Sequence, residues 1–248
     1  MLLEGKVAIV TGAGGAGVGG LGVTYAQALG AEGAAVVVAD IDGAAAELVA
    51  GELVRNGARA IGVGCDVTVD DDIDAMVRAT CTEFEGVDIL VNNAGLARGK
   101  WNEGSTLATT DWMHILAVNT VAPIACARAC RPVMRARGGG VIVNQSSSGA
   151  YMESGAYTVS KAALNAVTRT LAAEFADDGI RVNGIAPGMM TAKLPPDLVE
   201  AMLSRQTVRR PGRPDDLIEA LLFLCSDRSA FVNGQTLLVD GGVARGGI

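Results

Sequence analysis

Seven short apolar runs separated by longer helical patterns place the strongest constraint on how this chain can fold. The runs are rich in Val, Ile and Ala and are mostly continuous rather than alternating. Continuous runs predict strands that are covered on both faces, as in a parallel sheet. The predicted strands are 6–11, 34–40, 58–66, 87–93, 140–147, 180–186 and 235–240.

The stretches between these runs are rich in Ala, Leu and Glu and predict helices. They are 20–31, 43–56, 69–84, 109–136, 155–177 and 214–226. Strands and helices in alternation require right-handed crossovers between parallel strands. We therefore predict an α/β fold in which residues 1–248 form a single Rossmann-like domain, a doubly wound parallel sheet of about seven strands.

One segment breaks the alternation. Residues 187–214 contain several prolines and glycines and no long apolar run. In doubly wound sheets, ligands bind outside the carboxyl ends of the strands, which is where this segment is predicted to lie. We expect a substrate lid at about 188–213, with an ordinary connection as the alternative.

Composition excludes several classes of partner. Half of the 248 residues are apolar, only 4% are aromatic, and the formal net charge is −7. An acidic chain is not attracted to nucleic acid or to an anionic membrane. The N-terminal segment has the pattern of a first strand and lacks that of a signal peptide. Charged residues or glycines interrupt each long apolar stretch, so no transmembrane span is predicted and we expect a cytoplasmic protein.

The five cysteines are odd in number and irregularly spaced, which does not indicate a disulfide framework. Cys126 and Cys130 are one helical turn apart, but no histidine or second cysteine pair lies near them in the sequence. We expect packed, reduced thiols and no metal site. The single histidine, His114, has no evident acid–base partner and is interpreted as structural or solvent-facing.

A glycine-rich turn follows the first predicted strand and precedes a helix. It contains Gly12 and continues to Gly20-Leu21-Gly22. Glycines let the backbone approach a pyrophosphate closely, and a helix N-terminus offers free N–H groups and the positive end of its dipole. Flexible loops are also rich in glycine, so the position between strand and helix is what indicates a dinucleotide site.

The second strand ends at Asp40, which is followed by Ile41. A carboxylate at this point can accept hydrogen bonds from the adenosine ribose hydroxyls and would repel a 2′-phosphate. The glycine-rich turn contains no Arg or Lys. These features favour NAD(H) over NADP(H). Asp40 could instead cap the next helix, although Asp42 is available for that role.

The next two strand ends extend the predicted cofactor site. Asp66-Val67 follows the third strand, where a carboxylate could meet the adenine amino group. Asn93-Ala94-Gly95 ends the fourth strand, and these small residues allow backbone contact with a cofactor. Polar or small residues at successive strand ends together predict a binding site for one dinucleotide.

Tyr157 and Lys161 lie one turn apart on one face of a predicted helix. A phenol has an ordinary pKa of about 10 and is a poor base at neutral pH. A nearby ammonium and an oxidised nicotinamide favour the phenolate, which could take a proton from an alcohol. A tyrosine and a lysine at this spacing also occur by chance on the surfaces of helices.

Two further polar groups support an active site. The fifth strand ends in Ser146-Ser147-Ser148, whose hydroxyls could bind a substrate oxygen. Asn119 is a polar residue among apolar neighbours and could hold a water that links Lys161 to solvent. As an ordinary core amide, Asn119 would still need hydrogen-bond partners.

Taken together, these motifs resemble the short-chain dehydrogenase/reductase family over nearly the whole chain. The resemblance also includes Arg181-Val182-Asn183, Pro187-Gly188 and Asp240-Gly241-Gly242. It implies a catalytic tetrad of Asn119, Ser147, Tyr157 and Lys161, in which Ser147 polarises the carbonyl and Asn119 anchors a relay water. It further implies a homotetramer (or a homodimer) and an NAD site. The expected cofactor contacts are Gly12, Gly20, Leu21, Gly22, Asp40, Ile41, Asp66, Val67, Asn93, Ala94, Gly95, Tyr157, Lys161, Pro187, Met190 and Thr191.

Three features depart from the family pattern. Seven residues separate Gly12 from Gly20, where the family usually has three, so the amides that bind phosphate are not fixed. The spacing of ten from Ser147 to Tyr157 is about three residues short, which leaves Ser146 and Ser148 as rival candidates. Thr191 lies one place earlier than the family threonine that contacts the carboxamide.

The resulting hypothesis is an enzyme that interconverts a secondary alcohol and a ketone with NAD(H). A reductase of 3-oxoacyl thioesters is the alternative within the family, and a dehydrogenase of cyclic or aromatic alcohols also fits. A dinucleotide-binding protein without turnover is the alternative from another class. It would be expected to lose Tyr157, Lys161 or Ser147, and all three are present.

Overall fold

Seven parallel strands form one sheet in the order β3-β2-β1-β4-β5-β6-β7. The computed structural model describes residues 1–15, 20–97, 99–152, 155–190, 199–200 and 203–244. The strands are β1 (Val7–Thr11), β2 (Ala35–Asp40), β3 (Ala60–Gly64), β4 (Ile89–Asn92), β5 (Gly140–Gln145), β6 (Ile180–Pro187) and β7 (Thr236–Val239). The predicted Rossmann-like doubly wound sheet is confirmed, and each strand lies within one residue of its predicted range or inside it.

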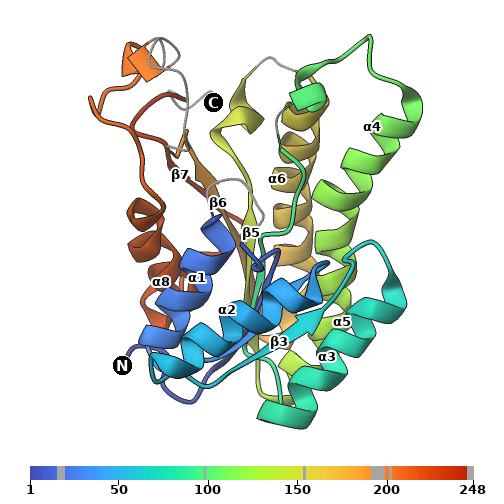
Figure 1. The fold of residues 1–248 in the computed structure, drawn as a ribbon, viewed down its shortest axis with the longest axis vertical. Helices are drawn as coiled ribbons and strands as arrows, with labels where there is room; N and C mark the ends of the chain where they lie inside the picture. The colour runs from blue at the N-terminus through green and yellow to red at the C-terminus, as the bar shows by residue number, and fades with distance from the viewer. Residues whose placement is uncertain (16–19, 98, 153–154, 191–198, 201–202, 245–248) are drawn as a thin grey trace.

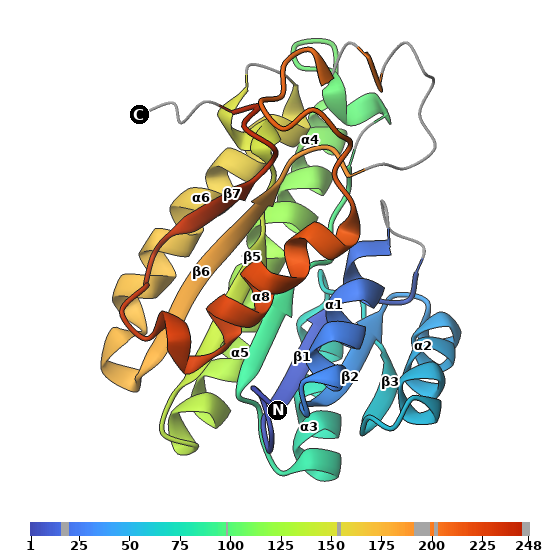
Figure 2. The ribbon, with the colours of Figure 1, turned by 90° about the vertical axis from the view of Figure 1, so that its left-hand side faces the viewer.

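Helices cover both faces of the sheet (Figures 1 and 2). One face is covered by α1 (Leu21–Ala31), α2 (Gly43–Arg55) and α8 (Ile218–Cys225). The other face is covered by α3 (Asp70–Phe84), α5 (Ala122–Ala136) and α6 (Ala156–Glu174). Each face of the sheet therefore buries its own apolar core.

The strands feed both cores because successive side chains point to opposite faces. In β1, Ala8 and Val10 belong to the core under α1, whereas Val7 and Ile9 belong to the core under α3 and α5. All five residues of this strand are buried. This two-sided burial is the physical origin of the continuous apolar runs in the sequence.

The predicted helix 109–136 consists of α4 (Thr109–Leu116), a π-helical turn (Ala117–Val121) and α5. Its length and apolar composition would be sufficient to cross a membrane, but half of its most apolar window is buried inside the protein. It is a core helix of the α/β fold. The π turn contains Asn119, and such turns are frequent at functional sites.

The irregular segment is only partly described. The predicted lid at about 188–213 includes residues 191–198 and 201–202, which lie outside the described residues, so the lid stays a prediction. Toward the C-terminal end of the segment, the backbone N–H groups of Thr207 and Val208 both donate to the Gly241 carbonyl at 2.9 Å. Met190 and Gly212 form a parallel bridge, which fixes both ends of the segment beside the sheet edge.

All five cysteines are free, as expected, and four of them are buried: Cys65, Cys126, Cys130 and Cys225. Burial raises the pKa of the Cys130 thiol to about 12, which keeps it protonated at neutral pH. Among the described residues, no group of three or more His, Cys, Asp or Glu side chains is arranged to hold a metal ion.

Candidate active site

A cavity of about 410 Å³ opens along the carboxyl edge of the sheet. Residues at or just after the carboxyl ends of β1 to β6 line it. The cavity therefore crosses the topological switch point between β1 and β4, where the strand order reverses. The predicted residues in its wall are Gly12, Gly20, Leu21, Gly22, Asp40, Ile41, Asp66, Val67, Asn93, Ala94, Gly95, Ser147, Tyr157, Lys161, Pro187 and Met190. Asn119 lies behind the wall, and Thr191 lies outside the described residues.

Close packing explains two glycines of the first turn. A Cβ on Gly12, whose φ is +65°, would lie 2.6 Å from the Cα of Ala94. A Cβ on Gly22 would lie 2.4 Å from the Gly12 carbonyl oxygen. The Asn93 side chain donates to the carbonyls of Thr11 and Gly12 at 2.9 and 2.8 Å, which fixes the turn against the end of β4. The turn is thus held where the N-terminus of α1 faces the cavity.

Asp40 occupies the end of β2 at the cavity wall. Its carboxylate accepts hydrogen bonds from the backbone N–H of Gly14 at 2.7 Å and of Asp42 at 3.1 Å. Asp42, not Asp40, caps α2, because its side chain accepts from Ala45 N at 3.0 Å. The helix-cap alternative for Asp40 is therefore excluded, and its carboxylate is held in place beside the glycine turn.

Asp66 and Val67 line the cavity beyond the end of β3. The hydroxyl and backbone N–H of Thr68 donate to the Asp66 carboxylate, which lowers its pKa below the ordinary value, with a smaller contribution from His114. His114 also lines the cavity, from α4. The sequence interpretation left His114 without a place in the site. Its spacing of four residues from Val118, another wall residue, is the signal that could have placed it there.

Tyr157 and Lys161 extend from the first turns of α6 into the cavity wall. The Lys161 ammonium is buried, with 4% of the residue exposed, and donates to the Gln145 carbonyl at 2.7 Å. Burial lowers the Lys161 pKa to about 8. An ammonium group whose pKa lies close to neutral pH, one helical turn from a phenol, is suited to holding and passing a proton.

The shifted pKa of Lys161 leads to a prediction about stability. Below pH 8 the folded and unfolded states both bind the proton, so the full cost of burying the charge is present. Between pH 8 and 10.5 the unfolded state binds more protons, and stability rises with pH. The shift corresponds to about 3 kcal/mol, offset by about 1 kcal/mol for the hydrogen bond to Gln145. We expect Lys161→Met to stabilise the cofactor-free protein by about 1–2 kcal/mol at pH 7.

Urea unfolding at pH 7 and at pH 9.5 checks this expectation, and the gain should shrink or reverse at the higher pH. The exposed Lys6 provides the matched control, since Lys6→Met removes a solvated charge and should change little at either pH. A Lys161→Met variant that is equally destabilised at both pH values would contradict the expectation.

The three serines after β5 occupy different surroundings. Ser146 also lines the cavity, but it is buried and donates to the Asn165 side chain at 2.6 Å, and Ser148 is buried outside the described wall. Ser147 accepts from the backbone N–H of Gly149 at 3.0 Å and lines the cavity. A Cβ on Gly149 would lie 3.2 Å from the Ser147 hydroxyl oxygen and 3.4 Å from the Tyr157 ring. This geometry favours Ser147 as the serine beside Tyr157, and the shortened loop folds as a single 3₁₀ turn (Ser148–Tyr151).

Asn119 is fully buried in the π turn. Its side-chain oxygen accepts from Leu96 N at 2.8 Å, and its amide donates to the Leu96 carbonyl at 2.9 Å and to the Ser160 hydroxyl at 3.0 Å. A Cβ on Gly95 would lie 3.1 Å from the Asn119 oxygen and 3.5 Å from the Lys161 nitrogen. Asn119 thus ties the loop after β4 to α6 directly behind Lys161. The relay water stays a prediction.

The segment after β4 also fixes the start of α6. The backbone N–H groups of Gly155 and Ala156 donate to the carbonyls of Asn102 and Glu103, at 3.2 and 2.9 Å. A Cβ on Gly155 would lie 2.2 Å from the Glu103 carbonyl, so only glycine permits this contact. Trp101 packs beside it on Ile115 and Ala156, which identifies it as a core residue and not as part of the described cavity wall.

Comparisons with known proteins identify similar oxidoreductases. Residues 14–244 match the family model described as enoyl-(acyl carrier protein) reductase. An uncharacterized oxidoreductase of Mycobacterium tuberculosis is 41% identical, over 97% of this chain and 98% of its own. The cis-4-hydroxycyclohexanecarboxylate dehydrogenase of Sinomonas cyclohexanicum is 37% identical, over 96% of both chains.

A solved structure is similar throughout. A 7α-hydroxysteroid dehydrogenase complexed with NADH and 7-oxo glycochenodeoxycholic acid superposes with a TM-score of 0.90 at 35% identity, covering 97% of this chain and 94% of that one. The chain belongs to the short-chain dehydrogenase/reductase family, as the sequence motifs indicated. It is an oxidoreductase of the class that acts on hydroxyl and keto groups.

Proposed function

We propose that this protein is an NAD(H)-dependent enzyme that interconverts a secondary alcohol and a ketone, with Tyr157 as the acid–base group. The observation that carries the proposal is a single cavity whose wall includes Tyr157, Lys161 and Ser147 near the end of β5 and Asp40 at the end of β2, three strand positions away. An acid–base group and a cofactor-selecting carboxylate are thereby joined by one continuous wall.

The residues present fit a dinucleotide. Gly12 and Gly22 of the glycine turn are too closely packed to accommodate a side chain, and the N-terminus of α1 that follows the turn can bind an anion. Asp40 bounds the adenosine end, and Asp66 and Val67 follow it along the wall. When bound, NAD would accept a hydride from an alcohol, and NADH would donate one to a ketone.

Each catalytic side chain has a distinct part in this proposal. Ser147 donates a hydrogen bond to the substrate oxygen and orients it. The Tyr157 hydroxyl holds or releases the proton at that oxygen, and the Lys161 ammonium stabilises the phenolate. Asn119 keeps the loop after β4 in contact with α6, and it anchors the predicted relay water. The proposed result is transfer of a proton between Tyr157 and the substrate oxygen, coupled to hydride transfer.

The substrate proposed is a small molecule that carries a secondary hydroxyl on an apolar, alicyclic frame. Apolar side chains line the cavity near the catalytic end, including Leu96, Ala97, Val118 and Met190. Two of the similar proteins are named for cyclic alcohols, a hydroxycyclohexanecarboxylate and a 7α-hydroxysteroid. A 3-oxoacyl thioester reductase is the alternative, supported by the description of the matching family model.

We also propose a cytoplasmic homotetramer, or homodimer. Large apolar side chains are exposed on the outer surfaces of the helix 109–136 and around β7. They include Met113, Val121, Phe231 and Leu237. Exposed apolar side chains that gather on particular elements favour contact with another copy of the chain.

A substrate panel tests the function. Formation of NADH from NAD, and separately of NADPH from NADP, would be followed in the presence of cis-4-hydroxycyclohexanecarboxylate, a 7α-hydroxy bile acid or a 3-hydroxyacyl thioester. We expect turnover with NAD and an alicyclic alcohol. Preferred turnover of the thioester would support the alternative, and NADH binding without turnover of any alcohol would identify a binding protein.

A further inference from the structure

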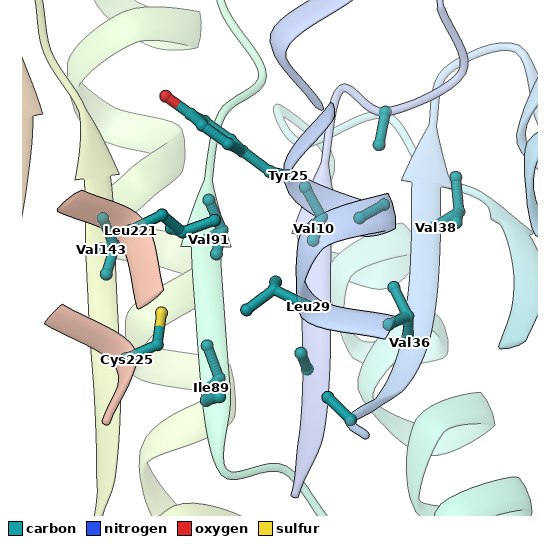
Figure 3. Packing of buried hydrophobic residues seen from close by; sticks show 14 of the residues in the cluster. Val10, Tyr25, Leu29, Val36, Val38, Ile89, Val91, Val143, Leu221 and Cys225 are labelled. Atoms are coloured by element: carbon teal, nitrogen blue, oxygen red, sulfur yellow. The ribbon is translucent and has the colours of Figure 1, made fainter. Parts of the chain in front are cut away.

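A buried polar pair connects α1 to β5 inside an otherwise apolar core. The Tyr25 hydroxyl donates to the side-chain oxygen of Gln145 at 2.6 Å. Tyr25 is fully buried, and its burial raises the pKa of its phenol well above the ordinary value. Figure 3 shows its ring among Val91, Val143 and Leu221, with the hydroxyl directed toward β5. The phenol is therefore a permanent donor with one acceptor.

Gln145 stands at the catalytic end of the cavity. It is the last residue of β5 and it lines the cavity. Its backbone carbonyl accepts a hydrogen bond from the Lys161 ammonium at 2.7 Å. Ser146 and Ser147 follow it directly, and Pro187 lines the wall on the neighbouring strand. Gln145 therefore lies beside the residues proposed for catalysis, at the end of β5, whereas Asp40 lies three strand positions away at the end of β2.

The hydrogen bond from Tyr25 fixes the orientation of the Gln145 amide. Since the side-chain oxygen accepts from Tyr25, the amide nitrogen occupies the other position. That nitrogen carries two hydrogens. Among the described residues it has one acceptor, the Ser146 carbonyl at 3.3 Å. The second N–H of this amide has no acceptor among the described residues, and Gln145 lines the cavity.

We propose that Gln145 is a cofactor-binding residue and that Tyr25 is the residue that positions it. The remaining N–H of Gln145 donates to an acceptor oxygen on the nicotinamide half of the dinucleotide, either on its phosphate or on its ribose. This inference rests on the proposed NAD function. Tyr25 belongs to α1, whose first residues line the expected diphosphate position, so the pair also ties that helix to the strand that carries the Lys161 acceptor.

Binding of two nucleotides to the intact protein tests the inference. NADH contains the proposed acceptor, whereas AMP lacks the second phosphate, the second ribose and the nicotinamide. Calorimetric titration would compare wild type, Gln145→Met, Tyr25→Phe and the double variant. The control is Thr80→Val, which removes a buried hydroxyl on α3 that donates to the Met76 carbonyl and is absent from the described cavity wall.

The expected result is selective. Gln145→Met should weaken NADH roughly tenfold, as for one lost hydrogen bond, and leave AMP binding within about twofold. Tyr25→Phe should weaken NADH roughly threefold and leave AMP unchanged, and the double variant should match Gln145→Met, because the two residues act as a unit. Thr80→Val should change neither affinity. Thermal unfolding of each variant identifies any general loss of structure.

Equal loss of AMP and NADH affinity in Gln145→Met would overturn the inference, since it would show a general disturbance of the site. Unchanged NADH affinity in that variant would also overturn it. Failure of the proposed function has a different signature, in which the wild-type protein binds NADH no more tightly than AMP.

Discussion

Tyr157→Phe is expected to lower kcat roughly 10³-fold while the Kd for NADH changes by less than about twofold. The substitution removes one hydroxyl and keeps the ring that packs beside Ile115 and Ala156. Without that hydroxyl, no other described side chain in the cavity wall combines a titratable oxygen with a buried ammonium one helical turn away. Steady-state rates with an alcohol found in the panel, together with NADH titration, measure both quantities.

Tyr151 offers a matched control for this experiment. It lies on the 3₁₀ turn before α6, is 38% exposed and is absent from the described cavity wall. Tyr151→Phe should therefore retain most of kcat. If the two variants kept the same activity, Tyr157 would not be the acid–base group and the proposed mechanism would be wrong.

The sequence predicted the fold because burial on both faces leaves a direct pattern in each strand. Runs such as residues 35–39 are apolar throughout, since each residue belongs to the core above or below the sheet. The π turn at Ala117–Val121 leaves no such pattern. Within it, Asn119 contacts Leu96 and Ser160, which are distant in sequence, so no local pattern marks the turn.

Parts of the site were predictable for a related reason. A parallel sheet brings the carboxyl ends of its strands to one edge, so polar residues such as Asp40 and Asp66 were placed together by topology alone. Gln145 and Tyr25 were missed because a single polar residue at the end of a strand, or a tyrosine in an apolar helix, looks like ordinary core. Their importance depends on an interaction between residues 120 positions apart.

Asp40→Asn is expected to change the ratio of the NADPH and NADH dissociation constants by at least about 100-fold in favour of NADPH. Two charges about 4 Å apart near a protein surface interact by about 4 kcal/mol, which salt reduces, and about 1.4 kcal/mol corresponds to tenfold in affinity. The wild-type carboxylate, fixed by Gly14 and Asp42, would repel a 2′-phosphate and accept the ribose hydroxyls. Asparagine keeps the size of the side chain and removes the charge.

Asp42→Asn provides the control for this change in charge. Asp42 is exposed, two residues away, and caps α2 through Ala45, a role that asparagine performs equally well. Asp42 lies outside the described cavity wall, so loss of its charge should change the ratio of the two dissociation constants by no more than about threefold. This small change is what remains of a longer-range interaction that salt screens. Fluorescence titration with both cofactors distinguishes a contact at the ribose from the general field of an acidic protein. Equal effects of the two variants, or a wild-type protein that binds NADPH more tightly, would show that Asp40 does not select the cofactor.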